Sequence, residues 1–208
     1  MLDYEGIKAL GKIFPGTKAN RFIEWFTYSD ESIDGKSKTK AYALFETSFI
    51  DSLEVGTTKG LQQIQAYLFG GLYDFAGQIR TKTISKGGYQ FTPAHYLSTQ
   101  LKTIEEMPET TIVEITDKYA ALNRAHSFME GNGRSTRIWL DLMLKKRLKN
   151  CIDWSKISKR DYMNAMMLSS TKSNTLKTLL NNAFTIKIND RETFMKGIDY
   201  SYYYEENE

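Results

Sequence analysis

Residues 126–137 read HSFMEGNGRSTR and join two stretches that have helical patterns. The stretch before them opens with a capping-box pattern at Thr111–Glu114 and repeats apolar residues at helical spacing as far as Leu122. The stretch after them, residues 134–148, is broadly apolar, which is typical of a helix at the centre of a fold. We therefore expect residues 126–137 to connect two core helices, as a loop that leads into the first turn of the second helix at Arg134, with the rest of the chain packed around this pair.

Further helices are predicted on both sides of this pair. The chain has only three prolines in 208 residues, which favours long helices over a turn-rich β fold. A first helical pattern contains Ile7, Leu10 and Ile13, and the other patterns cover residues 41–53, 58–69, 93–107, 158–168, 175–184 and 190–205. Residues 29–40 are polar and charged, and we expect them to form an exposed loop within an N-terminal extension, residues 1–54.

One segment has a β pattern. The β-branched run Ile79–Ile84, the pair Gly87–Gly88 and the alternating Tyr89–Phe91 predict a β-hairpin, the only good one in the chain. The dipeptide Thr92–Pro93 then fits the N-cap and first position of the next helix. The predicted fold class is mostly α, as a single domain with one small β-hairpin.

Composition excludes several classes of protein. The chain has 28 Lys and Arg against 25 Asp and Glu, and a net charge of +3 is too small to indicate a nucleic-acid partner. The single cysteine, Cys151, excludes an internal disulfide framework and fits a reducing compartment. The N-terminus shows no signal-peptide pattern, and no apolar stretch approaches the roughly 18 residues of a membrane helix. We expect a cytoplasmic protein without a membrane partner.

The glycines and arginines of residues 126–137 predict an anion site. Gly131 and Gly133 flank Asn132 directly before a helix, so that several backbone N–H groups can point into one space. Arg134 and Arg137 lie three residues apart in the first turn of that helix, on one face. Cations at a helix N-terminus oppose the helix dipole, a cost that is offset if an anion lies between them.

Two further residues of the segment predict catalytic chemistry. Glu130 offers a hard oxygen ligand suited to Mg²⁺ that bridges phosphate oxygens, and His126 is a base that titrates near neutral pH. Each feature alone has a simpler explanation: Gly-Asn-Gly is a common turn, and a histidine at a helix end often interacts with the dipole. Their combination within twelve residues favours a functional site.

The segment resembles the signature of the Fic-domain family, His-x-Phe-x-Glu/Asp-Gly-Asn-Gly-Arg-x-x-Arg, at every defining position. Most members of that family have proline where this chain has Ser127. The hairpin residues Ile84, Ser85, Lys86, Gly87 and Gly88 resemble the Fic flap. The resemblance covers roughly residues 55–205, and it implies a Fic-type helical bundle with residues 55–189 as its core.

The resemblance also implies an activity, the transfer of AMP from ATP to a Ser, Thr or Tyr hydroxyl of a target protein with Mg²⁺ as cofactor. The flap would pair with an extended target segment. The implied roles are a base for His126, a core anchor for Phe128, a Mg²⁺ ligand for Glu130, an anion hole for Gly131, Asn132 and Gly133, and phosphate binding for Arg134 and Arg137.

A second feature lies in residues 190–208. Phe194, Ile198, Ser201 and Glu205 form one stripe of a helix, and a buried carboxylate at its end needs a partner. A frayed terminal helix is the alternative interpretation. The stripe resembles the Ser/Thr-x-x-x-Glu inhibitory helix of Fic proteins, and this resemblance implies that Glu205 pairs with Arg137.

Two details of the C-terminal segment differ from the pattern or add to it. Glu206 follows the glutamate where the family usually has Gly or Asn. The adjacent Tyr202, Tyr203 and Tyr204 raise the hypothesis of self-modification.

Several alternatives remain open at this point. The chain could be a catalytically silent nucleotide- or partner-binding module, or a Fic enzyme that transfers another nucleotide or removes AMP. A metallohydrolase that uses His126 and Glu130 lacks ligands, since His95 is the only other histidine. The sequence leaves the target protein and the oligomeric state undetermined, and a homo-oligomer is one possibility.

Overall fold

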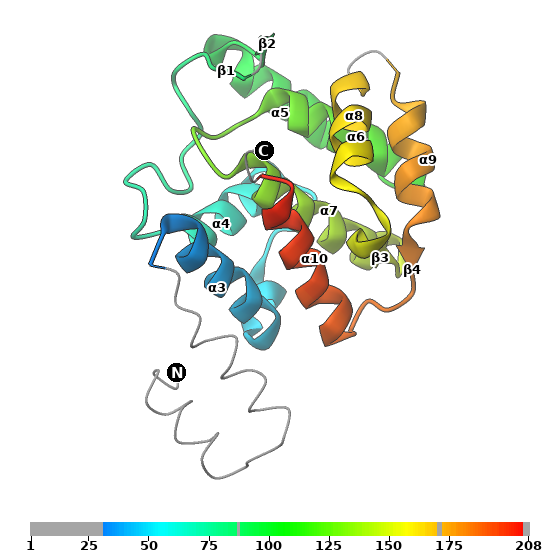
Figure 1. Cartoon of the computed structure of the whole chain (residues 1–208). Coiled ribbons are helices and arrows are strands. Elements are labelled where there is room, and N and C mark those ends of the chain that lie inside the picture. Colours follow the sequence, from blue (N-terminus) through cyan, green and yellow to red (C-terminus); the bar gives the residue numbers. More distant parts are fainter. Residues whose placement is uncertain (1–30, 87, 170–171, 206–208) are drawn as a thin grey trace.

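The computed structural model describes residues 31–86, 88–169 and 172–205 (Figure 1). The predicted helix around Ile7, the flap residue Gly87 and Glu206 lie outside the described residues. The helices and strands in chain order are α3 (Ile33–Glu46), α4 (Thr58–Phe69), β1 (Ser85–Lys86), β2 (Tyr89–Gln90), α5 (Leu97–Glu106), α6 (Ile112–Ala125), α7 (Asn132–Leu148), β3 (Cys151–Ile152), α8 (Lys159–Leu168), α9 (Asn174–Asn182), β4 (Phe184–Thr185) and α10 (Arg191–Tyr203), with short 3₁₀ helices at Ser48–Ser52, Ala94–Tyr96 and Trp154–Lys156. The prediction of a mostly helical fold is confirmed.

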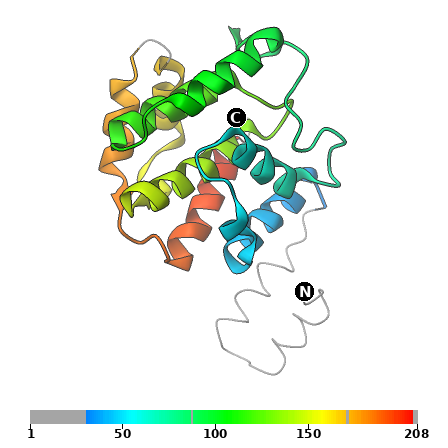
Figure 2. The ribbon, with the colours of Figure 1, turned by 180° about the vertical axis from the view of Figure 1, so that it is seen from behind.

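Helix α7 lies at the centre of the bundle. It packs against α6, α4, α10 and β3, and Figures 1 and 2 show it enclosed by helices from both halves of the chain. Its buried apolar side chains are Ile138, Trp139, Leu140, Met143 and Leu144. Burial of each large apolar side chain stabilises the folded state by about 1.5–3 kcal/mol. Helix α7 is therefore a rigid support for the residues at its N-terminus.

Helix α6 begins as the sequence predicts. Thr111 accepts a hydrogen bond from the backbone N–H of Glu114, and the Glu114 side chain accepts from the backbone N–H of Thr111, so the capping box is confirmed. The helix ends at Ala125, one residue before His126. The loop between the two core helices therefore starts where the sequence places it.

The N-terminal part of the described chain differs from the prediction. Residues 29–40 were expected to be a polar loop, but α3 begins at Ile33 with Ser32 as its N-cap, whose hydroxyl accepts from the backbone N–H of Gly35. The cause is a narrow buried stripe of Ser37, Ala41 and Leu44, which packs on α4 and α10. The helix ends at Glu46 rather than at residue 53.

The β structure also differs. The hairpin has only two residues in each strand, with Ser85 opposite Gln90 and Lys86 opposite Tyr89, and residues 79–84 are not a strand. The structure has the one predicted hairpin, and a second antiparallel pair, which joins β3 to β4 across α8 and α9, was not predicted. An alternation of apolar and polar residues cannot be recognised in a strand of only two residues. Pro93 precedes a 3₁₀ turn, and α5 starts only at Leu97.

Helix α10 runs beside α3 and across α7 (Figure 1). Asp190 caps it by accepting from the backbone N–H of Thr193, as predicted for a helix that starts at this point. The helix ends at Tyr203, and Glu205 lies in the turn that follows. Among the described helices, none has the length and apolar character needed to cross a membrane.

Candidate active site

The loop between α6 and α7 is built on two left-handed residues. His126 has φ 49° and ψ 64° and closes α6 through its backbone N–H, which donates to the carbonyl of Leu122 at 3.2 Å. Gly131 has φ 76°, and a Cβ at that position would overlap the ring of Phe69. Glycine is therefore required there both by backbone conformation and by space.

Two buried side chains hold the loop in shape. Phe128 is fully buried in the core. The Asn132 side chain bonds the backbone of Phe128 twice, since Oδ1 accepts from its N–H and Nδ2 donates to its carbonyl, both at 2.8 Å. Within the predicted anion hole, the Asn132 side chain thus turns inward, and only the backbone N–H groups at the start of α7 remain to meet an anion.

A pocket of about 370 Å³ lies above the N-terminus of α7. Its walls come from the flap, the end of α6, the start of α7, helix α8 and the turn after α10. The structure brings together five of the predicted site residues there, namely Lys86, His126, Gly133, Arg137 and Glu205. Glu130, Gly131, Asn132 and Arg134 do not line this pocket.

His126 is neutral in this environment. Burial lowers the pKa of His126 to about 4, and the positive charges of Arg80 and Lys86 act in the same direction. The carbonyl of Asn123 and the carboxylate of Glu205 oppose the shift without cancelling it. A histidine that is neutral at pH 7 has the protonation state that a general base needs, although its low pKa makes the ring a weaker base than an ordinary histidine.

Each of the three guanidinium nitrogens of Arg137 donates a hydrogen bond on the other side of the pocket. Its side chain is 2% exposed, and Nε donates to the Ser201 hydroxyl at 2.8 Å while Nη2 donates to the Ser201 carbonyl at 2.7 Å. Nη1 donates to the Tyr162 hydroxyl at 3.0 Å, and Nη2 also forms an ion pair with Glu205 Oε1 at 2.6 Å. The guanidinium lies over the rings of Tyr162 and Tyr204. Protein groups thus hold the Arg137 guanidinium through four of its five N–H donors in this state.

Glu205 occupies the place where the sequence predicts an anion. Its carboxylate lies against Gly133, so closely that a Cβ on Gly133 would overlap it. Burial raises the pKa of Glu205, but the charge and hydrogen bond of Arg137, together with Arg134 and Lys86, outweigh burial and lower it below its ordinary value. The N-terminus of α7 therefore already holds a negative charge, supplied by the protein itself.

Arg134 is held by a second carboxylate that the sequence analysis missed. Its guanidinium pairs with Asp34 of α3 and with Glu130, the latter at 3.1 Å, and lies between the rings of Phe69 and Tyr202. The Arg134 side chain is only 5% exposed, whereas that of Asp34 is 63% exposed. Residues 29–40 were interpreted as a loop, so no signal pointed to Asp34.

Glu130 fits the limited role that a Mg²⁺ ligand has in nucleotide sites. Its carboxylate accepts from the backbone N–H of Gly131 at 2.9 Å and remains half-exposed. Among the described residues, no group of three or more His, Cys, Asp or Glu side chains could hold a metal. One carboxylate with substrate phosphates is a usual donor set for Mg²⁺, so the residues present fit this ion only together with a nucleotide.

The flap forms one rim of the pocket. Lys86 and Tyr89 line it, and both strands of the flap are exposed. Phe91, directly after β2, stacks on the His126 ring with centroids 3.7 Å apart and planes 10° from parallel. Ile84 is half-buried and its carbonyl accepts from the Phe91 backbone N–H at 3.2 Å. Gly88 has φ 78° and makes the turn.

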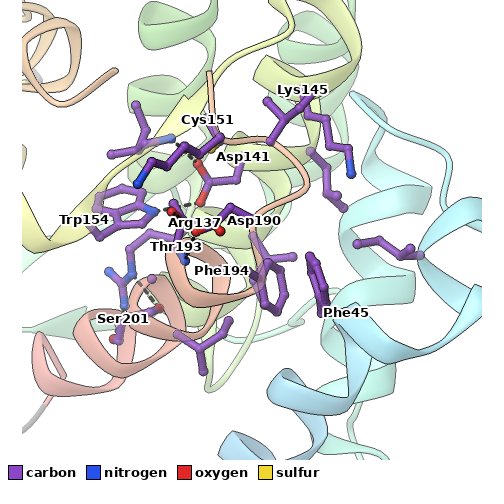
Figure 3. A pocket seen from close by; sticks show the side chains of 18 residues that line it. Phe45, Arg137, Asp141, Lys145, Cys151, Trp154, Asp190, Thr193, Phe194 and Ser201 are labelled. Atoms are coloured by element: carbon purple, nitrogen blue, oxygen red, sulfur yellow. Dashed lines mark hydrogen bonds between the residues drawn. The ribbon is translucent and has the colours of Figure 1, made fainter. Parts of the chain in front are cut away.

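A smaller cavity lies behind Arg137, between α7 and α10 (Figure 3). Asp141, one turn after Arg137, accepts from Trp154 Nε1 at 2.7 Å and from the backbone N–H of Ile152 at 2.9 Å. Burial raises the pKa of Asp141 to about 7, against the lowering effect of those hydrogen bonds. Gly197 brings α10 against Trp154, because a Cβ there would lie 3.1 Å from the indole. This layer fixes the position of α10 on α7.

The three tyrosines near the C-terminus differ in exposure. Tyr202 is buried and donates to the Ser37 hydroxyl at 2.9 Å, and Tyr204 is buried and donates to the carbonyl of Ile157 at 2.8 Å. Tyr203 is 47% exposed. Self-modification with α10 in place would have to begin at Tyr203.

Comparison with known proteins agrees with this geometry. Residues 56–144 match the sequence model of the Fic/DOC family. The chain is 27% identical over 177 residues to the protein adenylyltransferase VbhT of Bartonella schoenbuchensis, an alignment that covers 73% of this chain and 36% of that protein. The chain thus spans about a third of the length of this curated relative.

Solved structures share the fold. The BepC effector of Bartonella tribocorum with bound AMPPNP superposes with a TM-score of 0.63 at 18% identity, over 83% of this chain and 95% of that one. The N-terminal Fic domain of a Bep effector of Bartonella quintana with bound ADP gives 0.65 at 18% identity, over 82% and 88%. The predicted Fic-type helical bundle with its small flap is confirmed.

Proposed function

Because residues 56–144 match the Fic/DOC family and the described chain has the Fic fold, we propose that this protein is a protein adenylyltransferase. It moves AMP from ATP to a Ser, Thr or Tyr hydroxyl of a target protein. The observation that carries the proposal is the pocket in which a neutral His126 adjoins Arg137 and a helix N-terminus that already accommodates a carboxylate. A triphosphate is the anion that suits this place.

In the proposed reaction, the imidazole of His126 takes the proton of the target hydroxyl while the hydroxyl oxygen attacks the α-phosphorus. The new bond joins that oxygen to the α-phosphorus, and the bond from the α-phosphorus to the bridging β-oxygen breaks. Pyrophosphate leaves with the bridging oxygen. The backbone N–H groups at the start of α7 and the guanidinium of Arg137 stabilise the charge on the phosphates.

Other groups in the pocket, and Glu130 outside it, would bind and orient the substrates. The apolar wall of α8, with Tyr162, Met163, Met166 and Met167, suits the flat face of a nucleobase. Glu130 would hold Mg²⁺ with the phosphate oxygens, and the ion would supply charge neutralisation there. The exposed strands of the flap would pair with an extended segment of the target.

We also propose that the enzyme is autoinhibited. Glu205 and Ser201 take up the donors of Arg137, so an incoming triphosphate meets a carboxylate where its own charge belongs. ATP can then bind only in a pose that misaligns the α-phosphate. Release of α10 or loss of Glu205 restores the clamp.

Nucleotide choice and activity are tested together. Purified Glu205→Gly protein is incubated with lysate and, in separate reactions, with ATP, GTP, CTP or UTP labelled at the α-phosphate. We expect labelled protein bands with ATP. Labelling with a different nucleotide alone would replace ATP as the substrate, and nucleotide binding without any labelling would favour a silent binding module.

The flap gives a prediction about target docking. Replacing Ser85 by proline removes a backbone donor from β1, so we expect target modification to fall at least about tenfold while nucleotide affinity stays within about twofold. Ser85→Ala, which keeps the backbone donor, is the matched control and should behave like the parent. Equal losses of nucleotide affinity and transfer in Ser85→Pro would mean that the hairpin is only structural.

Asp34 gives a prediction about Arg134. In the Glu205→Gly background, Asp34→Asn should raise the transfer rate by up to about fivefold, since an exposed ion pair is worth at most about 1 kcal/mol. Glu31→Gln is the control, because Glu31 lies just before α3 and pairs with Lys36 rather than Arg134. A rate that falls in Asp34→Asn would show that Asp34 supports the active conformation instead of opposing it.

A further inference from the structure

Arg80 is a buried cation that lies between the flap and His126. The residue is 4% exposed, and within the described part of the chain no carboxylate forms an ion pair with it. Its guanidinium donates only to backbone carbonyls. Nε donates to the carbonyl of His126 at 2.7 Å, and Nη1 to that of Lys82 at 2.6 Å. Nη2 donates to the carbonyls of Ala125, at 3.1 Å, and Thr92.

These four carbonyls belong to the two stems of the flap and to the C-terminal end of α6. Lys82 lies on the chain entering the flap, and Thr92 lies on the chain leaving it. Ala125 and His126 are the C-terminal end of α6, where carbonyls lack helical partners and a cation is favourable. The backbone N–H of Arg80 also donates to the carbonyl of Ser127 at 2.9 Å. One side chain therefore joins both stems of the flap to the base.

The same connection reaches the imidazole ring. Phe91, one residue before Thr92, stacks on His126 at 3.7 Å. The strain of a non-glycine residue at φ 49° costs on the order of 1 kcal/mol or more and persists only where the surroundings enforce it. The hydrogen bond from Arg80 Nε to the carbonyl of His126 restrains the backbone at this residue.

We propose that Arg80 is a positioning residue of the catalytic base, which holds His126 in its left-handed conformation and couples the ring to the flap. Target docking on the flap and alignment of the base are then one event. This inference rests on the proposed function for its catalytic meaning. Arg80 does not line the nucleotide pocket, so its effect is on the base and not on ATP affinity.

The charge of Arg80 has a separate, measurable effect. Burial is the main cause of the low pKa of His126, and Arg80 and Lys86 lower it further. The carboxylate of Glu205 raises the pKa of His126. Two further cations, Arg124 and Arg137, line the pocket together with His126. Removing the charge of Arg80 should therefore raise the pKa of His126, while Arg80→Lys should leave it low.

The test compares Arg80→Lys and Arg80→Gln in the Glu205→Gly background. We expect single-turnover transfer to fall on the order of 10²-fold in both variants, because neither side chain can serve four carbonyls and a small misplacement of the base is costly. The Kd of ATP should stay within about twofold of the parent. In Arg80→Gln only, the acidic limb of the pH–rate profile should move to higher pH.

Imidazole NMR titration provides a readout that needs no transfer. The chain has two histidines, so His95 is an internal reference for His126. A higher pKa of His126 in Arg80→Gln, with His95 unchanged, supports the proposal even if the parent labels no protein and the proposed function fails. Wild-type transfer in Arg80→Lys and Arg80→Gln, or an unchanged His126 pKa and tautomer in Arg80→Gln, would overturn it. If Arg80→Gln does not fold, the Arg80→Lys variant decides. A lower transfer rate with normal ATP affinity supports the positioning role of Arg80, and a parallel loss of ATP affinity contradicts it.

Discussion

Replacing Glu205 by glycine raises the rate of AMP transfer by about 10²-fold or more. The carboxylate forms a 2.6 Å ion pair with Arg137 and lies against Gly133 at the N-terminus of α7. In the proposed reaction, both the cation and the helix terminus bind the triphosphate. A bound substrate that is held out of line loses on the order of 10²-fold in rate, and the variant removes this obstacle.

The ion pair between Glu205 and Arg137, which we propose to be inhibitory, is fully formed at neutral pH. Glu205 has a lowered pKa in the folded protein, so the stabilisation from its ion pair exists above the ordinary carboxyl pKa and is lost as pH falls through the folded value. Ser201→Ala should activate more weakly than Glu205→Gly, because the serine carbonyl and the carboxylate still engage Arg137. Activity assays near neutral pH therefore measure wild-type protein in which the ion pair between Glu205 and Arg137 is formed.

The controls separate release of Arg137 from a general loosening of α10. Glu205→Gly/Arg137→Ala should lose the gain, since the released cation is what acts on the triphosphate. Glu192→Gly removes another carboxylate of α10, which forms an ion pair with Lys196 on the same helix, and should leave the rate at the wild-type level. Activation in Glu192→Gly equal to that in Glu205→Gly would contradict the role given to Glu205.

Replacing His126 by alanine in the Glu205→Gly background lowers transfer by about 10² to 10⁴-fold, the range of general-base catalysis. The residue is neutral because burial lowers its pKa to about 4, so the wild-type ring is ready to accept a proton. The Kd of ATP should change little, since the ring acts on the hydroxyl and not on the phosphates. Single-turnover labelling measures the first effect and calorimetry the second.

His95→Ala is the matched control for this substitution. His95 lies in the short 3₁₀ helix before α5, its ring is packed beside that of Tyr96, and it does not line the pocket. It should label at the parental rate. Parental labelling by His126→Ala would remove the base from the mechanism.

The centre of the site could be predicted because its residues are neighbours in the sequence. Within residues 126–137, spacing alone places His126 at the end of one helix and Arg137 near the start of the next, although α7 begins at Asn132, two residues before the predicted start. The pairing of Glu205 with Arg137 spans 68 positions, and only the family resemblance pointed to it; the ion pair is present in the structure. The helices were predicted well from apolar periodicity because that pattern, too, involves residues that are close in the sequence.

What the sequence could not reveal depends on contacts between distant segments. The helix that carries Asp34 was hidden because its buried stripe is narrow and its composition polar. The bonds of Arg80 go to four backbone carbonyls, which leave no trace in side-chain patterns. The two hydrogen bonds by which the Asn132 side chain closes the loop on Phe128 were likewise not foreseen. Each of these needs three-dimensional proximity to be seen.

The most direct test of the central claim compares ATP labelled at the α-phosphate with ATP labelled at the γ-phosphate. Glu205→Gly protein is incubated with each nucleotide and lysate, beside wild type and Glu205→Gly/His126→Ala. The account predicts protein labelling above that of lysate alone from the α-phosphate only, strong in Glu205→Gly, weak in wild type and lost in the double variant. Labelling from the γ-phosphate above that of lysate alone, or α-labelling that is equal in wild type and Glu205→Gly, would contradict it.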